Sequence, residues 1–88
     1  MGPRYSTGVK VRIKAHDSLG RVLDPKIQFY ENMIGEVLEA TNIVAFRSQP
    51  WLNIEGSFER IRVYHYTVRI NERITLHEVL EDCLEIMR

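Results

Sequence analysis

Residues 70–87, INERITLHEVLEDCLEIM, decide the fold of this chain because they support two different secondary structures. In the helical interpretation, Thr75 is the N-cap and Glu78, three residues later, closes a capping box. Apolar residues then recur at helical spacing along one face; they are Leu76, Val79, Leu80, Cys83, Leu84 and Met87. This interpretation predicts a C-terminal helix and an α+β domain.

The same residues also fit two short strands that are separated by turns. In this interpretation residues 71–72 make a tight turn, residues 73–77 form a strand, residues 81–82 make a second turn and residues 84–87 form the closing strand. Local helix and strand propensities are weak compared with tertiary pairing. The rest of the chain therefore has to decide between the two.

Two other segments have clear strand patterns. Residues 8–15, GVKVRIKA, alternate between apolar and basic residues, which predicts a half-buried strand. Residues 60–70, RIRVYHYTVRI, are rich in β-branched and aromatic residues. The apolar phase of this second segment changes between Val63 and Tyr64, which predicts either a β-bulge there or burial on both faces.

Residues 24–42, DPKIQFYENMIGEVLEATN, follow a turn-rich segment and are ambiguous. Asp24 and Pro25 are typical of an N-cap and the first residue of a helix. Gly35 then lies inside that helix, at a cost of about 1 kcal/mol. In a strand, the same glycine instead marks a place where the backbone bends or approaches another segment closely. Both interpretations remain open.

Residues 46–59, FRSQPWLNIEGSFE, contain several turn formers together with Phe46 and Trp51 and are expected to be a long loop. Loops of this length often carry contacts. Trp51 on this loop is a candidate anchor for a protein partner, because buried aromatic side chains dominate many interfaces. The partner-binding candidates across the chain are Phe46, Arg47, Trp51, Tyr64, Tyr66 and His77.

The size and charge of the chain limit its function. Its 88 residues are enough for one small domain, which we place at residues 8–88 after a flexible N-terminus at residues 1–7. The formal net charge of zero argues against nucleic acid as the default partner. Basic residues concentrate in residues 1–30 and acidic residues in residues 78–85, so the two ends either pair with each other or dock on charged partners.

Reactive groups occur singly in the sequence. Cys83 is the only cysteine, so the chain has no CxxC redox pair and no four-thiolate iron–sulfur site. His16, His65 and His77 have no metal-ligand partner at helix or hairpin spacing. We therefore predict that the chain is not an enzyme and has no catalytic residue, metal or cofactor of its own. No apolar run approaches the roughly 20 residues of a membrane span, so we expect a soluble, intracellular protein.

In the strand interpretation, the order of landmarks resembles the variable chain of ferredoxin–thioredoxin reductase. The segment GVKVRIKA is similar to the first strand of that family. The segment NMIGEVLE resembles its Met-x-Gly-Glu-Val motif, at Met33, Gly35, Glu36 and Val37. Residues 66–87 are similar to the family's ending, at positions Val68, Ile70, His77, Glu81, Asp82, Leu84 and Ile86. The resemblance covers most of the chain from Gly8 onward.

This resemblance implies a mainly β fold, a small SH3-like barrel of about five strands with a long inserted loop, and it favours strands at residues 70–87. In the family, a partner chain carries the iron–sulfur cluster and the reactive disulfide and passes electrons from ferredoxin to thioredoxin, while the variable chain packs against it and stabilises it. We therefore expect a non-catalytic subunit of a heterodimer with a catalytic iron–sulfur chain, located in the cytoplasm or the plastid stroma. Phe46 and Trp51 are expected near the contact. The chain departs from the family at residues 45–56, where it has extra residues.

Two alternatives belong to other classes. A peripheral subunit of a photosynthetic membrane complex, such as the photosystem I E subunit, is also a small SH3-like barrel with the same general pattern. An α+β domain with helices at residues 25–41 and 76–87 would instead bind RNA or a ribosomal partner. Aromatic and arginine residues would give it a base-stacking surface; they are Phe46, Trp51, Tyr64 and Tyr66 with Arg47, Arg62 and Arg69.

Overall fold

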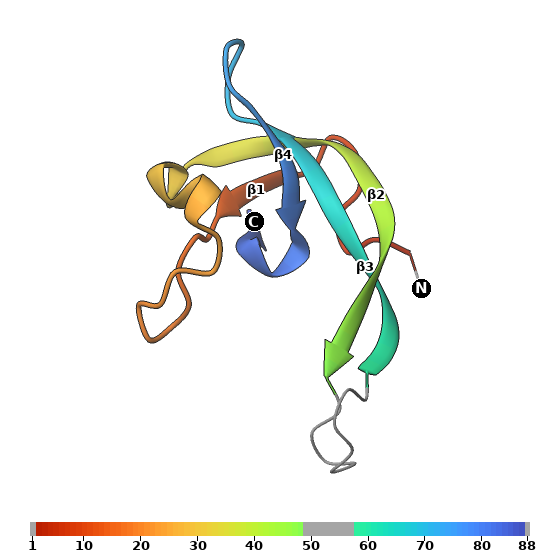
Figure 1. Cartoon of the computed structure of the whole chain (residues 1–88). Coiled ribbons are helices and arrows are strands. Elements are labelled where there is room, and N and C mark those ends of the chain that lie inside the picture. The colour runs from red at the N-terminus through yellow and green to blue at the C-terminus, as the bar shows by residue number, and fades with distance from the viewer. Residues whose placement is uncertain (1, 49–57, 88) are drawn as a thin grey trace.

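The computed structural model describes the backbone of residues 2–48 and 58–87 and the side chains of residues 2–44 and 61–87. Within these ranges the chain is mainly β, with five antiparallel strands in one sheet and two short 3-10 helices (Figure 1). The strands are β1 (Lys10–Ile13), β2 (Ile34–Ser48), β3 (Phe58–Arg69), β4 (Thr75–Leu80) and β5 (Leu84–Ile86), and the 3-10 helices are η1 (Pro25–Tyr30) and η3 (Glu81–Cys83). The predicted small β fold is confirmed, and the α+β alternative with two helices is wrong.

The sheet is curled but does not close into a barrel. Its strand order is β4-β3-β2-β1-β5, so β4 and β5 are the two edges, and no pairing joins them within the described residues. The short helix η3 leads the chain from the end of β4 to β5, which pairs with β1 instead. The expectation of a closed barrel is therefore corrected to an open five-stranded sheet.

The C-terminal stretch forms strands, as the resemblance implied. β4 pairs with β3 from Arg69↔Thr75 to His65↔Leu80. β5 pairs with β1 from Val11↔Ile86 to Ile13↔Leu84. These ladders use the backbone groups that a helix would have satisfied internally, so tertiary pairing overrides the capping-box signal. Residues 81–83 form the predicted turn, as one 3-10 turn.

The ambiguous segment after Asp24 contains a helical turn followed by a strand. The Asp24 side chain caps η1 by accepting a hydrogen bond from the Lys26 amide at 2.9 Å. The helix has only six residues, and β2 begins at Ile34. At Gly35, an added Cβ would lie 2.5 Å from Val68 Cγ1 on β3. Of the two interpretations left open for Gly35, the structure shows the strand with a close approach, and the long helix is wrong.

Of the two alternatives for the change of phase at Val63 and Tyr64, a β-bulge is not the one found in the structure. The β2–β3 ladder is regular from Glu39↔Thr67 to Ser48↔Phe58, so there is no bulge between Val63 and Tyr64, and both of these residues are half-buried instead. One register shift lies between Val37 and Glu39 of β2. The other lies between Tyr66 and Val68 of β3, where the facing residue Glu78 has a φ of 55°. Burial on both faces therefore explains the change of phase.

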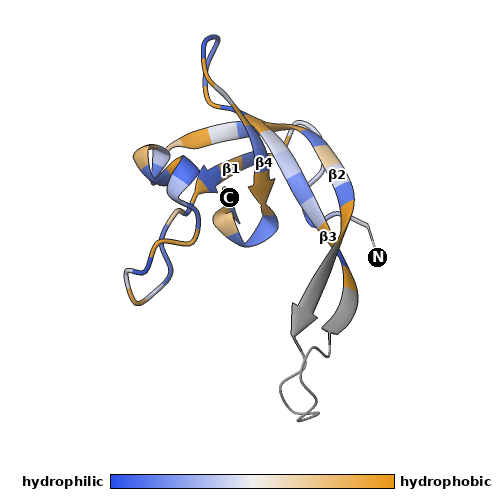
Figure 2. Cartoon of the chain, viewed as in Figure 1, coloured by the Kyte–Doolittle hydropathy of each residue, from blue (hydrophilic) through white to orange (hydrophobic). Residues whose placement is uncertain are grey.

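The hydrophobic core draws on every strand and on both 3-10 helices. Figure 2 shows apolar and polar residues alternating along the strands, the pattern that buries one face. The core residues are Tyr5, Val11, Ile13, Ala15, Ile27, Val37, Tyr66, Val68, Leu76, Val79, Cys83 and Leu84. Tyr5 belongs to the segment predicted to be flexible, yet only 4% of it is exposed. Its ring packs edge-on against Tyr66, with 5.4 Å between the ring centroids.

β2 and β3 continue beyond the core and beyond β4 as a two-stranded arm, defined here as residues 42–48 and 58–64 (Figure 1). The register pairs Phe46 with Arg60 and Arg47 with Glu59. Both ends of the stretch predicted to be a long loop are therefore strand, because backbone pairing continues into them. The remainder of that loop, including Trp51, lies outside the described residues.

Candidate partner-binding groove

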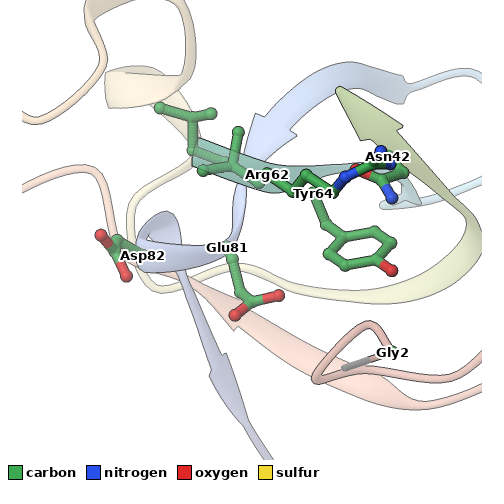
Figure 3. Close-up of a pocket in the computed structure, with 8 residues that line it drawn as sticks. Gly2, Asn42, Arg62, Tyr64, Glu81 and Asp82 are labelled. Carbon is green, nitrogen blue, oxygen red and sulfur yellow. The ribbon is translucent and has the colours of Figure 1, made fainter. Parts of the chain in front are cut away.

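A groove of about 560 Å³ lies between the base of the arm and η3. Its walls come from β2, β3, the end of β4, η3 and the N-terminal segment; the lining residues are Gly2, Asn42, Arg62, Val63, Tyr64, Leu80, Glu81 and Asp82. Figure 3 shows the Tyr64 ring and the Glu81 carboxylate extending into this hollow from β3 and from η3. The groove exists because the chain turns away at η3 while β3 continues straight into the arm.

The base of the groove is fixed by hydrogen bonds around the Tyr66 hydroxyl. This hydroxyl donates to Glu81 Oε2 at 2.6 Å and accepts from the Tyr5 amide at 3.3 Å. The Arg4 guanidinium lies 3.3 Å from Glu81 Oε1, and the Tyr5 hydroxyl donates to the Leu84 carbonyl at 3.0 Å. These contacts tie the N-terminal segment to η3 and β5, so the wall of the groove near Gly2 is held in place.

The Tyr66 hydroxyl stays protonated over the physiological pH range. Burial of the side chain and its hydrogen bond to the Glu81 carboxylate raise the pKa of Tyr66 to about 12. Both effects disfavour a phenolate, the first because charge is poorly solvated there and the second because two negative charges would face each other. Tyr66 is therefore a structural donor at the floor of the groove.

The two charged walls of the groove face solvent. Arg62 on β3 and Asp82 on η3 are both exposed, and neither makes an ion pair within the described part of the chain. Val63, Tyr64 and Leu80 supply the apolar surface of the groove. An apolar surface with one free charge of each sign is suited to a ligand that also carries both kinds of group.

Several other charged side chains form ion pairs within the described part of the chain. The basic and acidic ends meet in the pairs Arg4–Glu81 and Lys14–Glu85, the latter with 4.0 Å between Nζ and Oε2. A second hollow of about 410 Å³ lies beside the β3–β4 turn. It is bordered by Glu36, whose carboxylate forms ion pairs with Lys10 and Arg69. Because the Glu36 carboxylate is already paired with Lys10 and Arg69, we do not take that hollow as a binding site.

The structure separates the predicted partner-binding residues. Tyr64 lines the groove, whereas Tyr66 is only 1% exposed and lies in the core beneath it. His77 is exposed on β4 and does not line the groove. Phe46 and Arg47 lie on the arm, but their side chains, like Trp51, fall outside the described side chains. The base-stacking surface thus lacks Tyr66.

Other groove residues were missed as partner contacts by the sequence interpretation, chiefly Asn42 and Asp82. Asn42 pairs with Tyr64 across the β2–β3 ladder, so the two share a face. Asp82 was expected to lie in a turn and in the acidic segment at residues 78–85, but it was not named among the partner-binding candidates. Strand register was the signal needed to bring these residues together, and the sequence does not provide it.

The lone cysteine and the histidines do not form a reactive site in the described part of the chain. Burial raises the pKa of the Cys83 thiol, helped by nearby Asp24, so it remains a protonated core side chain. The His77 side chain is exposed to solvent, whereas the Cys83 side chain is buried in the core. His16 Nδ1 lies 3.3 Å from Glu31 Oε2, whose other contact is the Ala15 amide. Among the described residues, no group of three or more histidine, cysteine, aspartate or glutamate side chains is arranged to hold a metal ion.

The structure defines a small antiparallel β protein with an open sheet and a mixed-charge groove at its edge. No family model, curated protein or solved structure matches the chain. None of the helices in the described ranges has the length and apolar character needed to cross a membrane.

Proposed function

We propose that this chain is a non-catalytic subunit that binds and stabilises a catalytic iron–sulfur protein, in the manner implied by its resemblance to the variable chain of ferredoxin–thioredoxin reductase. In this proposal the partner supplies the cluster, the reactive disulfide and the contact with thioredoxin. This chain supplies a rigid surface. The two chains form a heterodimer in the cytoplasm or the plastid stroma.

The observation that carries the proposal is the position of the resembling residues in the fold. Gly35, from the Met-x-Gly-Glu-Val segment, lies where an added Cβ would come within 2.9 Å of the Arg69 carbonyl oxygen. Val68 is fully buried opposite Val37. Glu81 opens the turn that leads into the last strand. The proposal is supported by these residues, because each occupies a buried, closely packed or turn position in the sheet.

The groove and the arm support a role in protein binding. An isolated two-stranded ribbon is only marginally stable in water, so an arm that extends beyond its core is better explained by a partner that covers it. The groove at its base has exposed charges of both signs beside apolar side chains. Phe46 on the arm and Trp51, which lies outside the described residues, remain predicted contacts.

Co-expression with the catalytic chain of a ferredoxin–thioredoxin reductase from the same organism tests the proposal. We expect a one-to-one complex by size-exclusion chromatography with light scattering, with the visible absorption of the iron–sulfur cluster in the same peak. Trp51→Ala is expected to weaken the complex, whereas Phe29→Ala, on the exposed η1, serves as the matched aromatic control. Separate elution of the two chains would overturn the proposal. Recovery of this chain with thylakoid membranes would favour the peripheral photosynthetic subunit instead.

A further inference from the structure

Basic side chains line the outer face of β1. The side chains of Val11 and Ile13 are fully buried in the core. Successive side chains of a strand point to opposite faces of the sheet, so the residues that alternate with these two point away from the core. They form the basic face, defined here as Lys10, Arg12 and Lys14. The basic face is separate from the groove, because none of these three residues lines it.

The two outer residues of the basic face have loose ion pairs within the chain. Lys10 Nζ lies 3.9 Å from Glu36 Oε1 on β2, and Lys14 Nζ lies 4.0 Å from Glu85 Oε2 on β5. Both distances are at the outer limit of an ion pair, and exposed pairs of this kind contribute little to stability. Both ammonium groups therefore still attract a further anion.

Arg12, at the centre of the basic face, has no acceptor. It lies opposite Glu85 on β5 and Ile34 on β2, yet its guanidinium makes no hydrogen bond or ion pair in the described part of the chain. Among the described side chains, its Nε is the one buried nitrogen or oxygen atom without a hydrogen-bond partner. Its two Nη atoms are not buried in this way, so they are open to solvent.

This arrangement favours anion binding at Arg12. Burial of Nε removes water from one side of the guanidinium, and electrostatic attraction is stronger where water is excluded. A buried N–H group without an acceptor is also unfavourable, and most proteins avoid it. Arg12 is therefore a partly desolvated cation for which the described chain supplies no counter-ion.

We propose that the basic face binds an extended acidic segment of a protein, with one carboxylate accepting hydrogen bonds from the two Nη atoms of Arg12. Paired hydrogen bonds between a guanidinium and a carboxylate are among the strongest in proteins. Lys10 and Lys14 add attraction on either side. This inference goes beyond the proposed function and does not depend on the catalytic chain.

Charge and spacing favour carboxylates over the phosphates of a nucleic acid. Glu36 and Glu85 border the basic face, whereas nucleic-acid sites usually carry a clear excess of basic groups. Alternate residues of a strand lie about 7 Å apart, since each residue advances the strand by about 3.3 Å. Acidic residues at alternate positions of an extended segment have the same spacing. One of them can therefore meet Arg12 while its neighbours lie near Lys10 and Lys14.

NMR titration of the ¹⁵N-labelled chain tests this site directly. The probe is a short synthetic peptide that alternates glutamate and serine, and the control peptide has glutamine in place of glutamate. We expect the Nε–Hε signal of Arg12 to shift and saturate with the glutamate peptide. The corresponding signal of Arg21, whose Nε already donates to Asp17 Oδ2 at 2.7 Å, should stay in place. No shift at Arg12, or an equal shift with the glutamine peptide or with inorganic phosphate, would overturn the inference and leave the proposed function intact.

Substitution of Arg12 measures its share of the affinity. Arg12→Met keeps the long stem and removes the guanidinium, so we expect the dissociation constant of the glutamate peptide to rise about tenfold with the loss of the charged hydrogen bonds. Arg12→Lys keeps the charge without the planar fork and should also bind more weakly than the unchanged chain. Arg21→Met removes a guanidinium that is already paired, and this matched control should bind as the unchanged chain does.

Urea unfolding separates this binding role from a structural one. The urea midpoint of Arg12→Met should not fall, because the substitution removes a buried donor that has no partner in the described part of the chain. Equal peptide affinities for Arg12→Met, Arg12→Lys and Arg21→Met would contradict the inference. A lower midpoint for Arg12→Met with unchanged affinity would give Arg12 a structural role instead.

Discussion

The hydrogen bonds of the Tyr66 hydroxyl are the most informative target for a stability measurement. Tyr66→Phe keeps the ring and its edge-on contact with Tyr5 but removes the donor to Glu81 and the acceptor for the Tyr5 amide. The substitution therefore isolates the polar contacts that connect the N-terminal segment, the core and η3.

The expected loss in the free energy of unfolding is about 3 kcal/mol, since a hydrogen bond to a charged group contributes about 1.5–3 kcal/mol and a buried amide without a partner costs about 1–3 kcal/mol. The lower part of the combined range applies because the Glu81 side chain is 25% exposed, so water replaces part of what is lost. Urea unfolding followed by circular dichroism measures the difference. Tyr30→Phe is the matched control, because the Tyr30 hydroxyl has no hydrogen-bond partner in the described part of the chain.

We also expect the stability difference between the unchanged chain and Tyr66→Phe to depend on pH. The pKa of Tyr66 is raised from 10.0 to about 12 on folding, so the folded state keeps its proton at pH values where the unfolded chain has lost it. This contribution is fully present below pH 10 and is lost as the pH rises toward 12. The difference in stability between the unchanged chain and Tyr66→Phe should therefore shrink from pH 9 to pH 12. A loss below about 0.5 kcal/mol at pH 7, smaller than an ordinary hydrogen bond contributes, or a difference that grows with pH, would refute this reasoning.

Three further predictions concern single positions. Gly35→Ala should destabilise the chain by about 1–3 kcal/mol because the new methyl group meets Val68, whereas Gly2→Ala, with nothing within 4 Å, should have little effect; urea midpoints compare them. At Glu78, where φ is 55°, Glu78→Gly should be more stable than Glu78→Ala by about 1 kcal/mol, and equal stabilities would show that the left-handed backbone is not strained. Cys83, buried with a raised pKa, should react with a thiol reagent at pH 8 far more slowly in the native chain than in urea, and equal rates would contradict its burial.

Much of the sheet was predictable because it depends on local patterns. Alternation in residues 8–15 located β1, and β-branched content located β3. The C-terminal stretch was different, because its helix and strand signals were balanced locally. There the outcome depends on pairing with β1 and β3, and the residues of those strands lie outside residues 70–87.

The groove and its floor were not predictable from local patterns. Tyr5 has no periodic neighbours in the sequence, and its hydrogen-bond partners Tyr66 and Leu84 are 61 and 79 residues away. Arg62 and Asp82 border one groove only because η3 turns the chain across the end of β4. The bulge at Glu78 likewise results from pairing with β3 and not from any local turn residue.

We propose that this chain supports a catalytic partner and contributes no reactive group. The most direct measurement is the half-life of ferredoxin-dependent thioredoxin reduction by the catalytic chain, with this chain absent, present, or present as Cys83→Ala. We predict a longer half-life with either form of this chain and the same initial rate for both. An unchanged half-life, or a complex that forms but loses its initial rate with Cys83→Ala, would contradict the account.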